Sequence, residues 1–295
     1  MNAKAIEVIP SGAALGADVR GVNLAGPVDE ALKKAINAAW ADHSILLFRN
    51  QKLSDEELLN AARLFGTPQP VGFRLLNKNP DQREVKYPEI IAVSNREKDG
   101  TEEMDNAGLA DAEVHWHSDN SYIDAPPKGS MLFALVIPET GGDTGFCSQY
   151  AAYDALPDDM KKQIEGLRAK HDASRNSGGI LRPGFEIPET EDDVPGPFHP
   201  IVRTHPVTKR KALYLGRRRD YPSQFILGWN EKDSTEMLNY LWDHATQEKF
   251  VWMHKWRVGD LIIWDNRCAM HRRAATDPKL PRILHRTQLS GEKPE

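Results

Sequence analysis

The chain has 295 residues, of which 40% are hydrophobic, and this is enough to bury a sizeable core within one large domain. Lysine and arginine total 38 against 43 aspartates and glutamates, which gives a net charge of -5. This weak acidity provides no broad attraction for nucleic acid or for an anionic membrane. Any anionic ligand therefore has to be bound by a local group of basic side chains.

The longest apolar runs, such as Ser44–Phe48 and Leu261–Trp264, are far shorter than the roughly 18 residues of a membrane span and are typical of buried strands. The first ten residues lack the pattern of a secretory signal, so we expect a cytoplasmic protein. Only Cys147 and Cys268 are present, which excludes a disulfide framework and a CxxC metal knuckle. A bound metal would have to be held by histidines and carboxylates.

The first third of the chain alternates between extended and helical patterns. An apolar run at Ile6–Ile9 is followed by apolar positions at helical spacing over Leu32–Trp40, and then by a strand pattern at Ile45–Phe48. Ser54 with Glu57 three residues later forms a capping-box signature, which predicts a second helix. The apolar stripes of both helices are interpreted as core.

From residue 90 onward the sequence changes to short β-rich runs separated by turns and by two helical patterns. The helical patterns cover Ala151–Leu167 and Ser234–Thr246. Together, the β-rich runs and the helical patterns predict a mostly β protein with flanking helices around a jelly-roll core. The β-rich runs are Ile90–Val93, Met131–Val136, Pro200–Arg203, Leu213–Leu215, Phe250–Trp256, Leu261–Trp264 and Ile283–Leu289.

Two polar segments, near residues 78–113 and 176–197, are too long for tight turns. Segments of this kind are usually lids or disordered loops. We expect them to be insertions within a single domain that spans residues 1–295.

A candidate metal site begins with His117 and Asp119, which are two residues apart and would face the same side of an extended strand. By itself this pair is weak evidence, because such spacing also arises by chance. His271, which follows the strand pattern Gly259–Asp265 and a turn, is the best candidate for a third ligand. Two imidazoles and one carboxylate on one face of Fe(II) leave three positions open for reaction.

His115 is a local rival, because a regular strand would turn it to the same side as His117 and Asp119. Three ligands on one strand would be poorly spread around a metal ion. We therefore expect His115 to have a structural or indirect role.

The end of the chain offers candidate anion-binding residues. Arg282 and Arg286 are four residues apart, an even spacing that places both on one side of a strand. Arginine forms paired hydrogen bonds with carboxylates, so this arrangement would suit a dicarboxylate and an acidic substrate. A pair of surface salt bridges is the alternative. Thr144, after the turn at Gly141–Gly142, has a hydroxyl that could donate to a bound carboxylate.

These motifs in this order resemble the taurine/2,4-dichlorophenoxyacetate dioxygenase family over nearly the whole chain. The runs Ala151–Pro157 and His244–Gln247 look closer to the phenoxyacetate branch than to the taurine branch. The resemblance rests on His117-Ser-Asp119, Gly141-Gly-Asp-Thr144, Trp264-Asp-Asn-Arg267 with His271, and Arg282 to Arg286.

The resemblance implies a double-stranded β-helix and a dioxygenase that uses Fe(II), 2-oxoglutarate and dioxygen. It implies iron ligation by His117, Asp119 and His271, and contacts from Thr144 and Arg282 to the distal carboxylate of 2-oxoglutarate. The implied location of Arg286 is beside the substrate anion.

The expected substrate is a small anion, most simply an aryloxyalkanoate whose ether bond breaks after hydroxylation; the alternative in the same family is a sulfonate. The loop Thr67–Arg74 lacks the histidine of taurine enzymes, and Arg74 could replace it as an anion contact or be an exposed loop residue. Two other classes use similar residues: a zinc hydrolase with the same ligands, and a non-catalytic β-sandwich binding module. We expect no nucleic-acid or membrane partner, and we expect a homo-oligomer.

Overall fold

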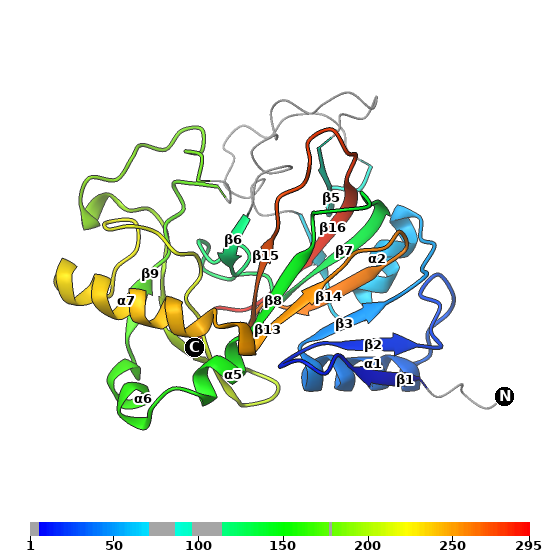
Figure 1. The fold of residues 1–295 in the computed structure, drawn as a ribbon, viewed down its shortest axis with the longest axis horizontal. Helices are drawn as coiled ribbons and strands as arrows, with labels where there is room; N and C mark the ends of the chain where they lie inside the picture. The colour runs from blue at the N-terminus through cyan, green and yellow to red at the C-terminus, as the bar shows by residue number, and fades with distance from the viewer. Residues whose placement is uncertain (1–5, 71–85, 96–113, 177–178) are drawn as a thin grey trace.

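The computed structural model describes residues 6–70, 86–95, 114–176 and 179–295. Within these ranges the protein is mostly β, with helices flanking two sheets (Figure 1). The larger sheet has the order β1-β2-β3-β14-β7-β16-β4, and β5 also pairs with β16. All described pairings in this sheet are antiparallel except that of β2 with β3. Its strands are β1 (Glu7–Pro10), β2 (Ala17–Arg20), β3 (Ile45–Phe48), β4 (Pro68–Gln69), β5 (Ile90–Ser94), β7 (Gly129–Val136), β14 (Leu261–Asp265) and β16 (Ile283–Leu289).

The smaller sheet is antiparallel and has the order β13-β8-β15-β6. Among the described strands, the edge strand β6 pairs with β15 alone. The strands are β6 (Val114–His117), β8 (Thr144–Ser148), β13 (Val251–His254) and β15 (Ala269–Arg273). Two further antiparallel pairs join β9 (Arg168–Lys170) to β10 (Phe198–Pro200) and β11 (Val202–Thr204) to β12 (Lys211–Leu213).

The two N-terminal helices pack against the larger sheet. Helix α1 (Glu30–His43) is capped by the side chain of Asp29, and α2 (Asp55–Arg63) has the predicted capping box between Ser54 and Glu57. Their apolar faces share one buried cluster with side chains from β3, β7 and β14. The predicted amphipathic helices are therefore confirmed, and their stripes belong to the core.

A second apolar cluster joins the two sheets. Along β3 the side chains alternate, so that Leu46 and Phe48 join the helix-facing cluster while Ile45 and Leu47 join the cluster that also contains Phe146 of β8. All four residues of β3 are buried. A strand covered on both faces has the continuous apolar sequence seen here, which explains the run that the sequence shows.

The remaining helices cover the smaller sheet at the other end of the molecule (Figure 1). The single helical pattern predicted for Ala151–Leu167 is wrong in one respect, because it forms α5 (Gln149–Asp154) and α6 (Asp158–Ile164) separated at Pro157. Proline has no amide hydrogen and fits the start of α6 better than the interior of one long helix. Helix α7 (Glu231–Ala245) corresponds to the predicted second pattern.

The β-rich runs are observed, most with shifted ends, except that the run predicted at Pro200–Arg203 covers the end of β10 and the start of β11 rather than one strand. Strands β8 and β15 were not among the predicted strands. Both contain polar residues, including Thr144, His271 and Arg273, that interrupt an apolar pattern. Residues 179–197 include a short 3-10 helix, Glu191–Asp193, whereas most of the predicted insertion near 78–113 lies outside the described residues. Among the helices described, none has the length and apolar character needed to span a membrane.

Candidate active site

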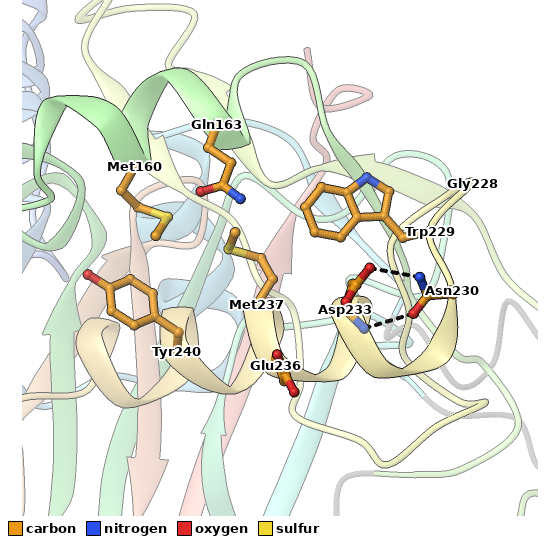
Figure 2. A pocket seen from close by; sticks show the side chains of 9 residues that line it. All are labelled: Met160, Gln163, Gly228, Trp229, Asn230, Asp233, Glu236, Met237 and Tyr240. Atoms are coloured by element: carbon orange, nitrogen blue, oxygen red, sulfur yellow. Dashed lines mark hydrogen bonds between the residues drawn. The ribbon is translucent and has the colours of Figure 1, made fainter.

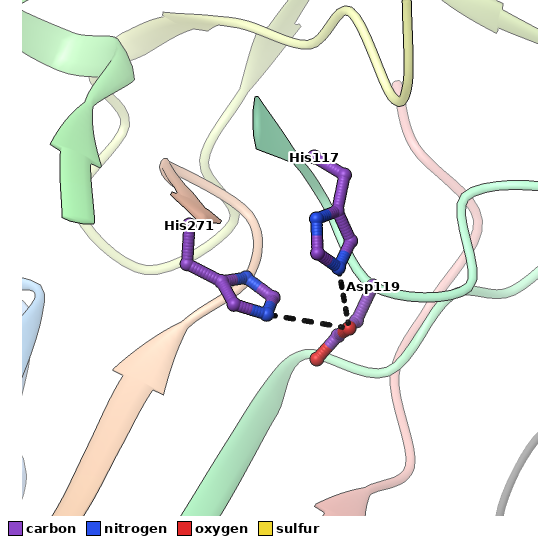
Figure 3. A group of neighbouring side chains, drawn as sticks. All are labelled: His117, Asp119 and His271. Carbon is purple, nitrogen blue, oxygen red and sulfur yellow. Dashed lines mark ion pairs between the residues drawn. The ribbon is translucent and has the colours of Figure 1, made fainter. Parts of the chain in front are cut away.

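The three predicted metal ligands, His117, Asp119 and His271, lie close together between the sheets. His117 Nε2 lies 3.6 Å from Asp119 Oδ1, and His271 Nε2 lies 3.8 Å from the same oxygen (Figure 3). All three residues are buried, and their potential ligand atoms lie within 4.8 Å of one another. The chain thus brings together two imidazole nitrogens and one carboxylate oxygen at a single point.

Pairing of two strands brings the histidines together. His117 at the end of β6 is the direct cross-strand partner of His271 on β15, and their ring centroids are 4.2 Å apart. His271 therefore follows β14 and a turn, as the sequence indicated, and lies inside the next strand, which was not predicted. Its ring also lies 4.7 Å from that of Trp264 on β14, so the larger sheet packs against the site.

A bulge in β6 explains why His115 is not a ligand candidate here. The pairing advances two residues on β15, from His271 to Arg273, while it advances three on β6, from His117 to Val114. The extra residue breaks the alternation of side chains, so His115 is exposed while His117 is buried. The prediction that both face the same side is wrong. The carbonyl of His115 nevertheless lies 2.8 Å from His117 Nδ1.

The sequence suggested that Asp119 lies on the same strand as His117. It does not, because β6 ends at His117. It lies in a turn that Asn266 holds in place: the Asn266 side-chain oxygen accepts from the Asp119 amide at 2.7 Å, and its nitrogen donates to the Asp119 carbonyl at 2.9 Å. The sequence analysis did not identify this role. Asn266 belongs to the Trp264–Arg267 motif, but its contact with Asp119 spans 147 positions and depends on the fold.

The protonation states of the three residues suit metal binding. Burial lowers the pKa of His117 to about 4, with a further contribution from Arg217, and burial also lowers the pKa of His271. Burial alone would raise the pKa of Asp119, but the charge of Arg286 and contacts with the histidines hold it well below its usual value. At neutral pH the site therefore offers two neutral imidazoles and one carboxylate.

The second oxygen of Asp119 is held from the larger sheet. Ser130 of β7 donates its hydroxyl to Asp119 Oδ2 at 2.7 Å, and Arg286 of β16 forms an ion pair with the same oxygen at 2.6 Å. Gln288 in turn donates to the Ser130 hydroxyl at 3.2 Å. These contacts leave Oδ1 directed at the two histidines (Figure 3).

Arg282 lies apart from the three candidate ligands, beside the turn that precedes β8. It is buried, and its guanidinium donates to the carbonyl of Gly142 at 3.1 Å. A Cβ on Gly142 would lie 2.7 Å from Arg282 Nε and 2.8 Å from Thr276 Oγ1, so glycine is required for this close approach. Both of those polar atoms are buried without a hydrogen-bond partner among the described residues.

Thr144 starts β8 close to this turn, and its hydroxyl accepts from Trp256 Nε1 at 2.9 Å. Its cross-strand partner on β15 is Arg273, a buried residue that the sequence analysis did not single out. Burial and the charge of Arg273 together lower the pKa of Arg282 to about 9. Two buried guanidinium groups this close favour the binding of an anion between or beside them.

Arg286 also lines a pocket next to Asp119. The pocket contains arginines from two loop segments that the sequence analysis had not connected with the site; Arg74, the predicted extra anion contact, lies outside the described residues. The lining residues are Ser118, Asp119, Asn120, Ser121, Tyr122, His171, Asp172, Arg175, Asn176, Arg217, Arg219 and Arg286.

A larger hollow lies elsewhere, between α6 and α7, and contains none of the predicted site residues. Figure 2 shows Met160 and Met237 facing each other across it, with Asn230 and Asp233 joined by hydrogen bonds at one end. It contains no histidine, no cysteine and no arginine. Its size therefore does not make it the chemical centre.

The chain is similar to known proteins over nearly its full length. The family described as "Taurine catabolism dioxygenase TauD, TfdA family" matches residues 7–288. An alpha-ketoglutarate-dependent 2,4-dichlorophenoxyacetate dioxygenase of Cupriavidus pinatubonensis is 37% identical over 92% of this chain and 92% of its own. An (S)-phenoxypropionate/alpha-ketoglutarate-dioxygenase of Delftia acidovorans is 33% identical over 97% and 95%.

The solved structure of AAD-2 in complex with Mn(II) and N-oxalylglycine is 31% identical, covers 98% of both chains and superposes with a TM-score of 0.80. Likeness to a family of oxygen-using enzymes argues against the zinc hydrolase and against the binding module. The chain belongs to the TauD/TfdA family of dioxygenases.

Proposed function

We propose that this protein is an Fe(II)- and 2-oxoglutarate-dependent dioxygenase that hydroxylates a small anionic substrate of the aryloxyalkanoate class. The observation that supports it most is the buried group of His117, Asp119 and His271, with its donor atoms turned toward one point. The named activities of the phenoxyacetate and phenoxypropionate relatives support the substrate class.

The donor set fits an iron ion. Two ligands about 2.1 Å from one ion and at right angles would lie about 3.0 Å apart, so the observed 3.6 and 3.8 Å require only small inward movements. His117 Nδ1 donates to the His115 carbonyl, which leaves the Nε2 lone pair for a metal. His117, Asp119 and His271 would hold Fe(II), which with 2-oxoglutarate and dioxygen supplies the oxidising power for hydroxylation.

The co-substrate site that we propose lies at the turn before β8. Arg282 would bind the distal carboxylate of 2-oxoglutarate, because its Nε is buried without a hydrogen-bond partner among the described residues. Thr144 and Thr276 offer hydroxyls from the two sides of this turn. A dicarboxylate would also reduce the repulsion between Arg282 and Arg273.

Arg286 would bind the anionic group of the substrate. It has one strong partner, Asp119, and its Nε is buried without a hydrogen-bond partner among the described residues. When a metal ion draws Asp119 Oδ1 toward itself, Arg286 keeps Oδ2 and still has donors for a substrate carboxylate. The substrate carbon would then lie next to the metal, and the anion would fix which carbon is hydroxylated.

The same proposal extends to the architecture. The two sheets packed through Phe146 and the β3 side chains support a double-stranded β-helix, and the family match over residues 7–288 supports one domain. The homo-oligomeric state stays a prediction.

An anaerobic titration tests the metal and co-substrate. Addition of Fe(II) and then 2-oxoglutarate to the protein should produce the visible charge-transfer band of the chelate, and absence of this band in folded protein would contradict the proposal. A panel of phenoxyacetates, sulfonates and short carboxylic acids, followed by succinate release, tests the substrate class. We expect the phenoxyacetates to give the highest kcat/KM, and a clear preference for sulfonates would favour the alternative.

A further inference from the structure

The pocket beside Asp119 contains more positively charged side chains than are required to bind one substrate carboxylate. Four arginines line it, Arg175, Arg217, Arg219 and Arg286, against the two aspartates Asp119 and Asp172. Asp119 is already paired with Arg286. Asp172 accepts from the amide and hydroxyl of Ser174 at 2.6 and 2.7 Å.

Three arginines follow one another at residues 217–219, and the backbone conformation there determines which of their side chains line the pocket. Arg217 forms an isolated antiparallel bridge with His117, which fixes this extended segment beside β6. Successive side chains of an extended chain point to opposite sides, so Arg217 and Arg219 line the pocket while Arg218 lies outside and pairs with Asp243 of α7 at 3.0 Å. Two of the three charges are therefore directed inward.

Arg219 and Arg175 have donors available for a ligand. Arg219 donates to the carbonyl of Asn176 at 2.8 Å, yet its Nε is buried without a hydrogen-bond partner among the described residues. Arg175 donates to the carbonyl of Gly179 at 3.0 Å. In the described parts of the chain, no carboxylate lies within ion-pair distance of Arg175 or Arg219.

Clustering these charges costs free energy in the absence of an anion. Burial and repulsion from Arg219 together lower the pKa of Arg217 to about 9. Burial also lowers the pKa of Arg219, where Asp172 opposes the shift and Arg175 adds to it. A bound anion would remove this mutual repulsion, and that gain would appear as binding energy.

We propose that the substrate is a compact dianion: one carboxylate is bound by Arg286 next to the metal, and a second anionic group is bound by Arg219, with Arg175 and Arg217, at the far side of the same pocket. This inference rests on the proposed function, since it specifies the substrate of that site. It predicts that aryloxyalkanoates with an acidic substituent on the ring are preferred over neutral ones.

Matched ligand pairs test the inference in the intact protein. The probes are 3- and 4-carboxyphenoxyacetate, each compared with the carboxamide of the same shape, so that one charge is the main difference. We expect the better acid of the two isomers to exceed its carboxamide by at least about ten-fold in kcat/KM, the effect of one charge-assisted hydrogen bond. Equal values, or a preference for the carboxamides, would overturn the proposal.

Two neighbouring arginines supply the variant and its control. Arg219→Gln should reduce the acid-to-amide ratio to about two or less, while Arg218→Gln, which alters the outward residue, should leave the ratio unchanged. Arg175→Gln is a second variant in case loss of the Arg219 contact to Asn176 impairs folding, which a thermal melt would show. An unchanged ratio in both pocket variants would overturn the assignment.

A binding measurement separates failure of this inference from failure of the proposed function. Protein loaded with Mn(II) and N-oxalylglycine, the pair bound in the AAD-2 structure, should give the same acid-to-amide ratio in Kd by calorimetry. If no compound is turned over but the Kd ratio holds, the proposed function fails and the dianion site stands. If phenoxyacetates are turned over and the Kd ratio is one, the inference alone fails.

Discussion

Among the described residues, two buried groups have the composition of a metal site, and one of the two has free ligand atoms directed at a common point. His117, Asp119 and His271 form the first group, and His205, Asp265 and Cys268 form the second; both are buried and both have candidate ligand atoms within 4.8 Å. The difference lies in what already occupies their lone pairs.

In the second group the ligand atoms are satisfied by the protein. His205 Nδ1 accepts from the amides of Val207 and Thr208 at 3.2 and 3.1 Å, so its Nε2 carries the proton and donates to Asp265 at 3.0 Å. Arg267 donates to both oxygens of Asp265 at 2.8 and 2.7 Å. Burial raises the pKa of the Cys268 thiol to about 12, so it is not a thiolate at neutral pH.

In the first group one nitrogen of His117 and one oxygen of Asp119 are committed to the protein, while the other nitrogen and the other oxygen remain for a ligand. Residue types therefore mark a candidate site, but the hydrogen bonds decide whether it can bind a metal. Five predictions test this contrast, from the largest expected effect to the smallest.

The largest effect is expected from removing a ligand of the first group. His271→Ala should abolish Fe(II) binding and lower succinate formation by at least about a thousand-fold, because the facial arrangement loses one of its three donors. Iron content after anaerobic reconstitution measures this directly. His205→Ala is the matched change in the second group, and it should retain one iron per chain. Full iron content in His271→Ala would remove this residue from the ligand set.

Breaking the second group should instead affect stability. Asp265→Asn removes the buried carboxylate that Arg267 and His205 both contact and leaves Arg267 only the more distant Glu292, at 3.7 Å, among the described carboxylates. We expect a loss of about 3–5 kcal/mol in the free energy of unfolding. The exposed pair of Asp154 and Arg210, at 3.0 Å, is the control, and Asp154→Asn should cost about 0.5 kcal/mol or less. Denaturant titrations at pH 7 measure both.

The pH dependence of this loss has a definite sign. Burial would raise the pKa of Asp265, but Arg267 and His205 outweigh burial and hold it below the ordinary value. A carboxyl group with a lowered pKa in the folded state stabilises the protein above its unfolded pKa of about 4, and this stabilisation is lost as the pH falls through the folded pKa. The difference between wild type and Asp265→Asn should thus shrink below about pH 4. A difference that grows in acid would contradict the buried ion pair.

A smaller effect is expected from the residue that orients Asp119. Ser130→Ala removes the hydroxyl that donates to Asp119 Oδ2 at 2.7 Å, and we expect Fe(II) affinity to fall by about 10- to 100-fold. Ser174→Ala is the matched control, because its hydroxyl donates at the same distance to Asp172, which is not a candidate ligand. Equal iron affinities in the two variants would show that the Ser130 contact does not matter.

The smallest effect is expected at His115. His115→Ala removes an exposed ring but keeps the carbonyl that lies 2.8 Å from His117 Nδ1. Iron affinity and kcat should change by about two-fold or less, as for other exposed substitutions. A ten-fold fall in iron affinity would mean that the ring itself takes part.

Local patterns predicted the elements whose determinants lie close together in sequence. The capping box at Ser54 and Glu57 and the apolar stripe that follows gave α2, and the run at Leu261–Trp264 gave the buried part of β14. The strand β15 was missed because His271 and Arg273 replace the apolar residues of a typical strand. Residues that serve a site interrupt the pattern by which a strand is recognised.

Sequence patterns singled out the residues of the candidate site but not their arrangement. The spacing of His117 and Asp119 drew attention to both residues, but the bulge in β6 and the turn at Asp119 depend on pairing with β15 and on Asn266, far away in sequence. The places of Arg217 and Arg219 in the pocket and of Arg273 near Arg282 could not be inferred, because no local pattern distinguishes an inward arginine from an exposed one.

The position of β6 at the edge of the smaller sheet has a consequence for local unfolding. Among the described residues this strand pairs within its sheet with β15 alone, and on its other side it has one isolated bridge, from His117 to Arg217. An edge strand of this kind frays more readily than a central one. The proposed ligands His117 and His271 are cross-strand partners on β6 and β15. An ion bound by both would therefore stabilise the pairing of these two strands. Metal loading and amide protection of the edge strand would then be two measures of the same equilibrium.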